Sequence, residues 1–152
     1  MAPLESSIEI TRPPEEVFAY VTDPSRFGEW QRDVVAVRRE GGEPGRAGSR
    51  FTTTRRIAGT ERSMTQEVTE AAAPRRWATR AVDGPVRPSA TVTVEPLADG
   101  AGSRVTFSLD FEGHGIGRPL LAVVRRQAGR AAPVSYRTLR ALLERRDDLR
   151  GR

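Results

Sequence analysis

Arg55 is the residue of this sequence whose charge and position most suggest a role in binding a ligand. In a predicted strand Phe51 is apolar, and the alternation of β-structure places Thr53 and Arg55 on its face. A guanidinium on a buried face needs an oxygen partner, and it binds carboxylates, phenolates and carbonyls well. Two interpretations follow: Arg55 anchors a polar group of a ligand, or it is exposed or paired with Glu61 or Glu67 on the neighbouring strand.

The same alternation places polar side chains among apolar ones on two further strands. Gln66 shares a face with Met64 and Val68, and Thr79 shares a face with Trp77. An unpaired buried polar group costs about 1–3 kcal/mol, so these side chains need protein partners or a polar ligand. They are therefore candidates for the wall of an interior space.

Large rings and one imidazole are the other candidates. Trp30, Trp77 and Tyr20 either pack in the core or stack on a flat ligand. His114 is the only histidine, and its position indicates a solvated loop, with general acid or base chemistry at a cavity mouth as the alternative. One histidine and no cysteine cannot form the usual zinc sites, and no nucleotide or serine-hydrolase motif occurs. We expect no metal and no cofactor.

These residues belong to a succession of predicted strands followed by one long helix. Two short helices are expected after the first strand, one beginning at Pro13-Pro14 and one after Asp23-Pro24. Strand after strand through short turns implies an antiparallel meander. The predicted strands are 5–10, 33–39, 49–57, 61–70, 76–82, 89–95 and 103–112.

The last predicted strand and the helix each present one apolar side. Phe107 and Leu109 alternate with polar residues, and the helix from Pro119 to about Asp148 has apolar residues at spacings of three and four. Pro133 interrupts this helix and is expected to bend it. The stripe comprises Leu120, Val124, Ala128, Ala131, Ser135, Leu139 and Leu142.

Length and composition indicate a single domain over residues 1–152, with a core from about 4 to 146. The sequence contains no apolar run of membrane-spanning length and no signal-like N-terminus, so we expect a cytoplasmic protein without integral membrane association. The net charge of +5 comes from arginines interleaved with acids, and no nucleic-acid-binding motif is present. We expect no nucleic-acid partner, and a monomer or homodimer.

Several phrases, in order along nearly the whole chain, resemble the SRPBCC or START-like superfamily of polyketide cyclase/dehydrase and lipid-transport proteins. They are PEEVF at 14–18, DPSRFGEW at 23–30, EVTE at 67–70, PRRW at 74–77, GSRVT at 102–106 and LRALLE at 139–144. The resemblance implies an α+β helix-grip (Bet v 1-like) fold. In that fold, a curved seven-stranded antiparallel sheet wraps around a long C-terminal helix, with two short helices between strands 1 and 2.

What the resemblance implies for function is an internal cavity between sheet and helix. We expect it to bind a small hydrophobic molecule of the lipid, polyketide or isoprenoid class. The alternatives are a cyclase/aromatase-type enzyme using Arg55, Gln66, Tyr20 or His114 to move protons, and an interaction protein acting through its basic surface. The candidate cavity residues are Trp30, Phe51, Thr53, Arg55, Met64, Gln66, Trp77, Thr79, Phe107, Leu109, Leu120, Val124 and Ala128.

Overall fold

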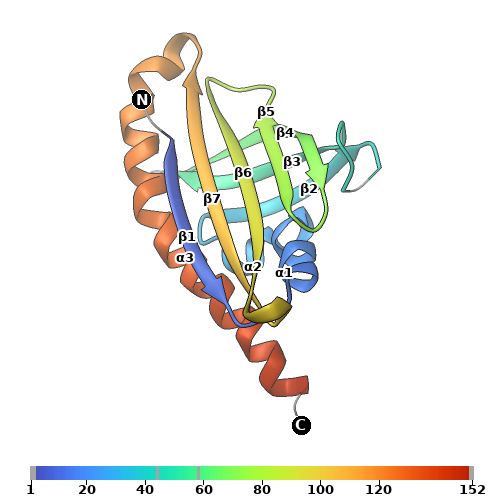
Figure 1. Ribbon diagram of the computed structural model, residues 1–152. Helices are drawn as coiled ribbons and strands as arrows, with labels where there is room; N and C mark the ends of the chain where they lie inside the picture. The colour runs from blue at the N-terminus through green and yellow to red at the C-terminus, as the bar shows by residue number, and fades with distance from the viewer. Residues whose placement is uncertain (1–2, 44, 58, 151–152) are drawn as a thin grey trace.

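The computed structural model describes residues 3–43, 45–57 and 59–150. Seven strands form one antiparallel sheet in the order β1-β7-β6-β5-β4-β3-β2, so β2 to β7 are a meander and β1 pairs with the last strand (Figure 1). The strands are β1 (Leu4–Ile10), β2 (Val34–Gly41), β3 (Arg50–Ile57), β4 (Thr60–Ala72), β5 (Arg76–Ala81), β6 (Val86–Leu97) and β7 (Gly102–Gly113). The predicted helix-grip fold is confirmed.

Two short helices connect β1 to β2. Helix α1 (Pro14–Val21) has proline in its first turn, where no backbone N–H bond is lost, and acids that oppose the positive end of the helix dipole. The Asp23 carboxylate then accepts a hydrogen bond from the Ser25 backbone N–H at 3.0 Å and caps η1 (Pro24–Arg26). The α2 helix (Phe27–Trp30) follows directly and points its two rings into the protein.

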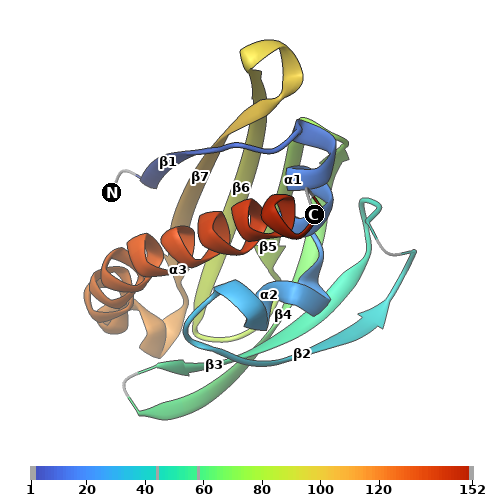
Figure 2. The same ribbon diagram turned by 90° about the horizontal axis from the view of Figure 1, so that it is seen from below.

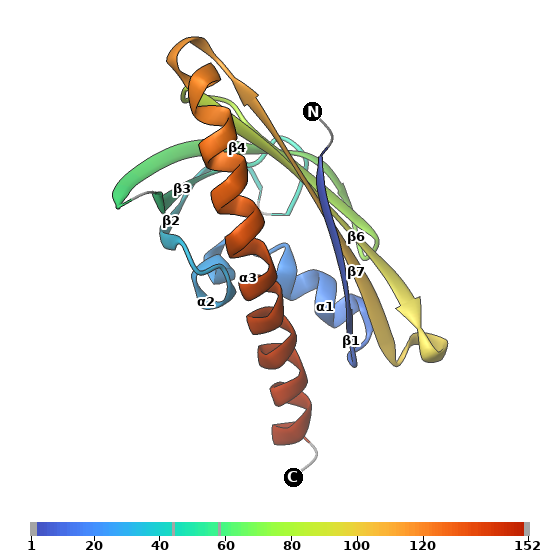
Figure 3. The same cartoon turned by 90° about the vertical axis from the view of Figure 1, so that its left-hand side faces the viewer.

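The long helix α3 (Leu121–Arg150) runs along the concave side of the curved sheet (Figures 2 and 3). It is preceded by η3 (Gly115–Leu120), so Pro119 lies in the 3₁₀ turn and the α-helix begins after it. Helix α3 continues through Pro133 without a break, and Pro133 itself is exposed. The proline therefore does not divide the helix into two elements.

Strand β6 is longer than the predicted segment 89–95, and it includes Pro88 and Pro96 near its ends. Both prolines are paired with β7, but β5 pairs with β6 only over 89–93. Proline is tolerated at the two positions because the strand has a ladder on one side only there. The strand therefore extends past both ends of the predicted segment 89–95.

The solid core occupies one end of the space between sheet and helix. Helix α1 and the C-terminal half of α3 pack there against β1, β6 and β7. Leu139 and Leu143 of α3 are fully buried, whereas Val124 and Ala128, nearer the start of the same helix, are only half-buried. The N-terminal half of α3 therefore spans the sheet without closing onto it.

Candidate ligand-binding cavity

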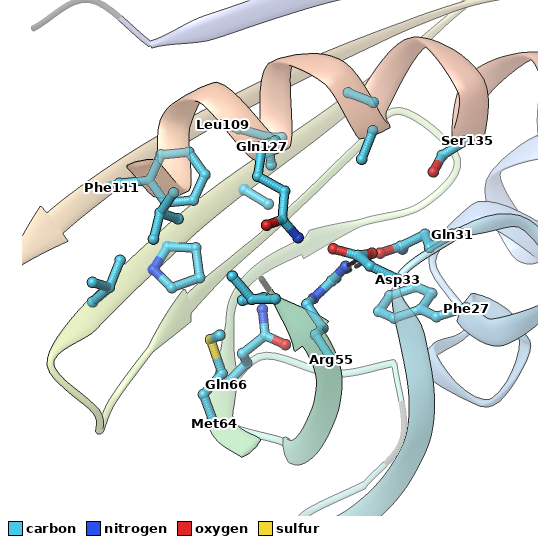
Figure 4. Close-up of a pocket in the computed structure, with 18 of the residues that line it drawn as sticks. Phe27, Gln31, Asp33, Arg55, Met64, Gln66, Leu109, Phe111, Gln127 and Ser135 are labelled. Atoms are coloured by element: carbon cyan, nitrogen blue, oxygen red, sulfur yellow. Dashed lines mark hydrogen bonds and ion pairs between the residues drawn. The ribbon is translucent and has the colours of Figure 1, made fainter. Parts of the chain in front are cut away.

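A cavity of about 470 Å³ lies between the concave face of the sheet and the N-terminal half of α3. This volume is within the usual range for small-molecule sites. Its wall is largely apolar, with side chains from α2, from β3 to β7 and from α3 (Figure 4). The polar side chains on that wall indicate which kind of ligand the cavity could bind.

All predicted cavity residues except Phe51 and Thr53 line this space. Phe51 is buried beneath α2, since the Phe27 ring covers it at a centroid distance of 5.8 Å. Thr53 is fully buried, and its hydroxyl donates to Gln66 Oε1 at 2.7 Å. The lining members of the predicted set are Trp30, Arg55, Met64, Gln66, Trp77, Thr79, Phe107, Leu109, Leu120, Val124 and Ala128.

Aromatic rings separate the cavity from the solid core. The Phe27 ring meets the edges of Trp30 and Trp77, both at 6.1 Å between centroids. On the opposite side, Phe107 of β7 stacks on Tyr136 of α3 at 4.0 Å with an interplanar angle of 10°. Trp30 and Trp77 are buried, and each also contributes to the cavity wall. For these two residues, packing in the core and lining the cavity are therefore compatible.

Tyr20 and His114, the other aromatic candidates for chemistry, lie outside the cavity lining. Tyr20 is buried in α1, and its hydroxyl donates to Glu29 at 2.8 Å. His114 is exposed between β7 and η3, with Nε2 at 3.7 Å from a carboxylate oxygen of Glu112.

Arg55 points into the cavity, but its partners are not those that the sequence indicated. Its guanidinium donates to Asp33 Oδ1 at 2.8 Å and to Gln31 Oε1 at 2.5 Å (Figure 4). The predicted partners pair elsewhere, Glu67 with Arg50 and Glu61 with Arg56.

These outer pairs form because the residues lie directly opposite each other in the β3–β4 ladder, on the face away from α3. Arg55 faces inward, and the segment between α2 and β2 supplies its acceptors. Bonded to a carboxylate and an amide oxygen, the guanidinium is held in place, and it keeps further N–H groups for a ligand oxygen.

Tyr136 is a cavity residue that the sequence analysis missed. Its side chain is 7% exposed, and its hydroxyl makes no hydrogen bond within the described part of the chain. Burial raises the pKa of Tyr136 to about 12, while the nearby positive charge of Arg55 acts in the opposite direction. At neutral pH the phenol is therefore protonated and can donate to an oxygen in the cavity.

Gln66 offers a second donor from the sheet. Its amide oxygen accepts from Thr53, and its amide nitrogen has no acceptor among the backbone and side-chain atoms that the structure describes. Arg55, Gln66 and Tyr136 thus present donors from β3, β4 and α3 into one largely hydrocarbon space. Such a wall suits a flat apolar molecule with one or more carbonyl, enol or carboxylate oxygens.

The family model described as polyketide cyclase/dehydrase and lipid transport matches residues 1–144 of this chain. The chain belongs to this family. Its members share the SRPBCC or START-like type indicated by the sequence phrases, which confirms that resemblance. No curated protein sequence matches the chain.

Solved structures show the same fold at low sequence identity. The Zhui aromatase/cyclase from Streptomyces sp. R1128 superposes with a TM-score of 0.77 at 15% identity, covering 95% of this chain and 94% of that one. A START superfamily protein from Mycobacterium smegmatis gives 0.74 at 16% identity, with 95% and 99% covered. The di-domain ARO/CYC BexL from the BE-7585A biosynthetic pathway gives 0.69 at 21% identity, with 93% of this chain and 46% of BexL covered.

Proposed function

We propose that this protein binds a small, largely apolar molecule in the cavity between sheet and α3, with an oxygen-bearing end of that molecule between Arg55 and Tyr136. The observation that carries the proposal is the cavity itself: about 470 Å³ of space lined mainly by hydrocarbon, with a free phenol and an oriented guanidinium on its wall. A protein without a guest would be expected to fill such a space with side chains, because interiors pack densely.

The polar side chains on the cavity wall restrict the chemical class of the ligand. A guest made only of hydrocarbon would leave the donors of Arg55, Gln66 and Tyr136 without acceptors, at a cost of about 1–3 kcal/mol for each group fully removed from water. A guest with carbonyl or carboxylate oxygens satisfies them. Lipids, polyketides and isoprenoids with oxygenated ends fit this description, and the family of the chain supports it.

A matched pair of variants on one helix tests the proposal. Ala128 lines the cavity, whereas Ala122 is an exposed alanine of the same helix outside the lining. Ala128→Trp should fill part of the space and weaken binding of an apolar dye such as aminoanthracene at least tenfold, and Ala122→Trp should leave its affinity unchanged. Unaltered dye binding in Ala128→Trp, or none in the parent protein, would remove the basis of the proposal.

A second function, cyclisation of a poly-β-keto chain, is favoured by the position of Tyr136 opposite Arg55. A protonated phenol and a guanidinium could polarise a carbonyl and donate to the developing enolate oxygen, which is the kind of stabilisation such a reaction needs. Product formation from a model polyketide, abolished in Arg55→Ala, would support this function. Binding of that polyketide without any turnover would leave only the binding function.

A further inference from the structure

Three of the four most exposed large apolar side chains in the described part of the chain lie close together in sequence, at the start of the C-terminal helix. Ile116, Leu120 and Val123 are 77%, 36% and 53% exposed, and they lie in η3 and the first turn of α3. Leu120 and Val123 both belong to the cavity lining as well, and Ile116 precedes them in the same segment. The fourth exposed large apolar side chain, Val35 at 51%, lies on the edge strand β2.

This apolar group lies at the cavity mouth and is held there. Leu120 and Val123 line the cavity as well as being exposed. The segment before them is packed on the β5–β6 turn: the His114 backbone N–H donates to the Pro85 carbonyl at 2.8 Å, and a Cβ on Gly117 would come within 1.8 Å of that carbonyl oxygen. The segment that carries these side chains is therefore held against the β5–β6 turn, and it lies at the upper end of α3 in Figure 3.

Positive charge surrounds the same side chains. Residues 115–130 contain four arginines and no acid. Arg125 approaches Asp110 at 4.0 Å, but Arg118 and Arg126 are exposed and form no ion pair with any described residue. Arg118 lies between Ile116 and Leu120 in the sequence, and Arg126 follows Val123 by one helical turn, so both cations are close to the apolar group.

We propose that this mouth surface, formed by Ile116, Arg118, Leu120, Val123 and Arg126, docks on a bilayer that contains anionic phospholipid. Apolar side chains that project beyond the backbone can enter the boundary between headgroups and acyl chains, and flanking arginines bind lipid phosphates. The association is peripheral, because no helix among the described residues is long and apolar enough to cross a membrane. Docked in this way, the cavity opens toward the bilayer, and this last step rests on the proposed ligand binding.

Vesicle sedimentation tests the docking with a variant outside the cavity wall. Ile116 does not line the cavity, so Ile116→Asp alters the surface alone. We expect the parent protein to bind phosphatidylcholine vesicles that contain phosphatidylglycerol, and to bind them less as salt increases. Ile116→Asp should lower this affinity about tenfold, as should the double variant Arg118→Gln/Arg126→Gln, whereas the matched control Val35→Asp should not change it.

The docking would be overturned by an absence of binding of the parent protein to the anionic vesicles, or by an equal loss in Ile116→Asp and Val35→Asp. If vesicle binding is absent and the protein self-associates through Ile116, the surface is instead a protein interface. Aminoanthracene titration without vesicles separates docking from the proposed function. Ile116→Asp should keep its dye affinity, and a parent protein that binds vesicles but no dye would contradict the cavity proposal while leaving the docking in place.

Discussion

Replacing Tyr136 with phenylalanine should change folding stability and ligand affinity in opposite directions. The ring would keep its stack on Phe107, and the removed hydroxyl has no partner in the described part of the protein. Removing an unpaired buried hydroxyl leaves no acceptor unsatisfied, so the free energy of unfolding should stay the same or increase by up to about 1 kcal/mol.

The same variant should lose a hydrogen bond to an oxygen-bearing guest. That bond contributes about 1 kcal/mol, which corresponds to about fivefold in affinity. Menadione and methylnaphthalene make a suitable pair of probes, since they have the same ring skeleton and differ in their carbonyl groups. The chain has no cysteine with which a quinone could react. Tyr136→Phe should weaken menadione in aminoanthracene displacement and leave methylnaphthalene unchanged.

The other tyrosine provides the control. The Tyr20 hydroxyl donates to Glu29 and lies outside the cavity lining, so Tyr20→Phe should lower stability by about 1 kcal/mol and leave both affinities unchanged. Urea unfolding gives the stabilities. Loss of more than about 1 kcal/mol in Tyr136→Phe, or equal menadione affinity in parent and variant, would refute the assignment of the Tyr136 hydroxyl to ligand recognition.

Further predictions concern the same polar wall. Folding raises the pKa of Tyr136 from 10.0 to about 12, so the unfolded chain loses this proton at lower pH than the folded protein. The free energy of unfolding should therefore be unaffected by this group below pH 10 and fall by roughly 2–3 kcal/mol as the pH rises to 12. Tyr136→Phe should lack this fall in urea unfolding at alkaline pH, and an identical fall in the variant would contradict the cause. Arg55→Met should weaken menadione about tenfold, whereas Asp33→Asn, which keeps an acceptor for Arg55, should weaken it less. Equal losses in these two variants would argue against direct contact by Arg55.

The strands were predictable because their signals are local. Phe107 and Leu109 alternate with polar residues, and turns mark the ends of most strands. The length of β6 was not predictable in the same way. The strand continues through Pro88 and Pro96 because β5 does not pair with it there, which only the sheet shows.

The partners of Arg55 could not be read from the sequence because they depend on tertiary structure. The alternation correctly put Arg55 on the inner face, but Gln31 and Asp33 come to it from the chain before β2, more than twenty residues away. Likewise, only the docking of Phe27 over Phe51 shows that the cavity ends before that residue.

Tyr136 did have a signal that was not used. Continuing the spacing of four from Leu120 through Val124 and Ala128 leads to Ala132 and Tyr136, and all of these line the cavity. The stripe drawn through Ala131 and Ser135 also lies on the cavity side of α3, because the apolar face of the helix is broad. A single row of residues therefore underestimates what one helix contributes to the cavity.

A crystal of the protein soaked with bromonaphthalene would test the central claim most directly, since the anomalous signal of bromine locates the probe without reference to the protein model. We predict a peak between α3 and the concave face of the sheet, within van der Waals distance of Val124, Leu109 and the Tyr136 ring. An interior closed by side chains, with bromine absent or found only on the outer surface, would contradict the account.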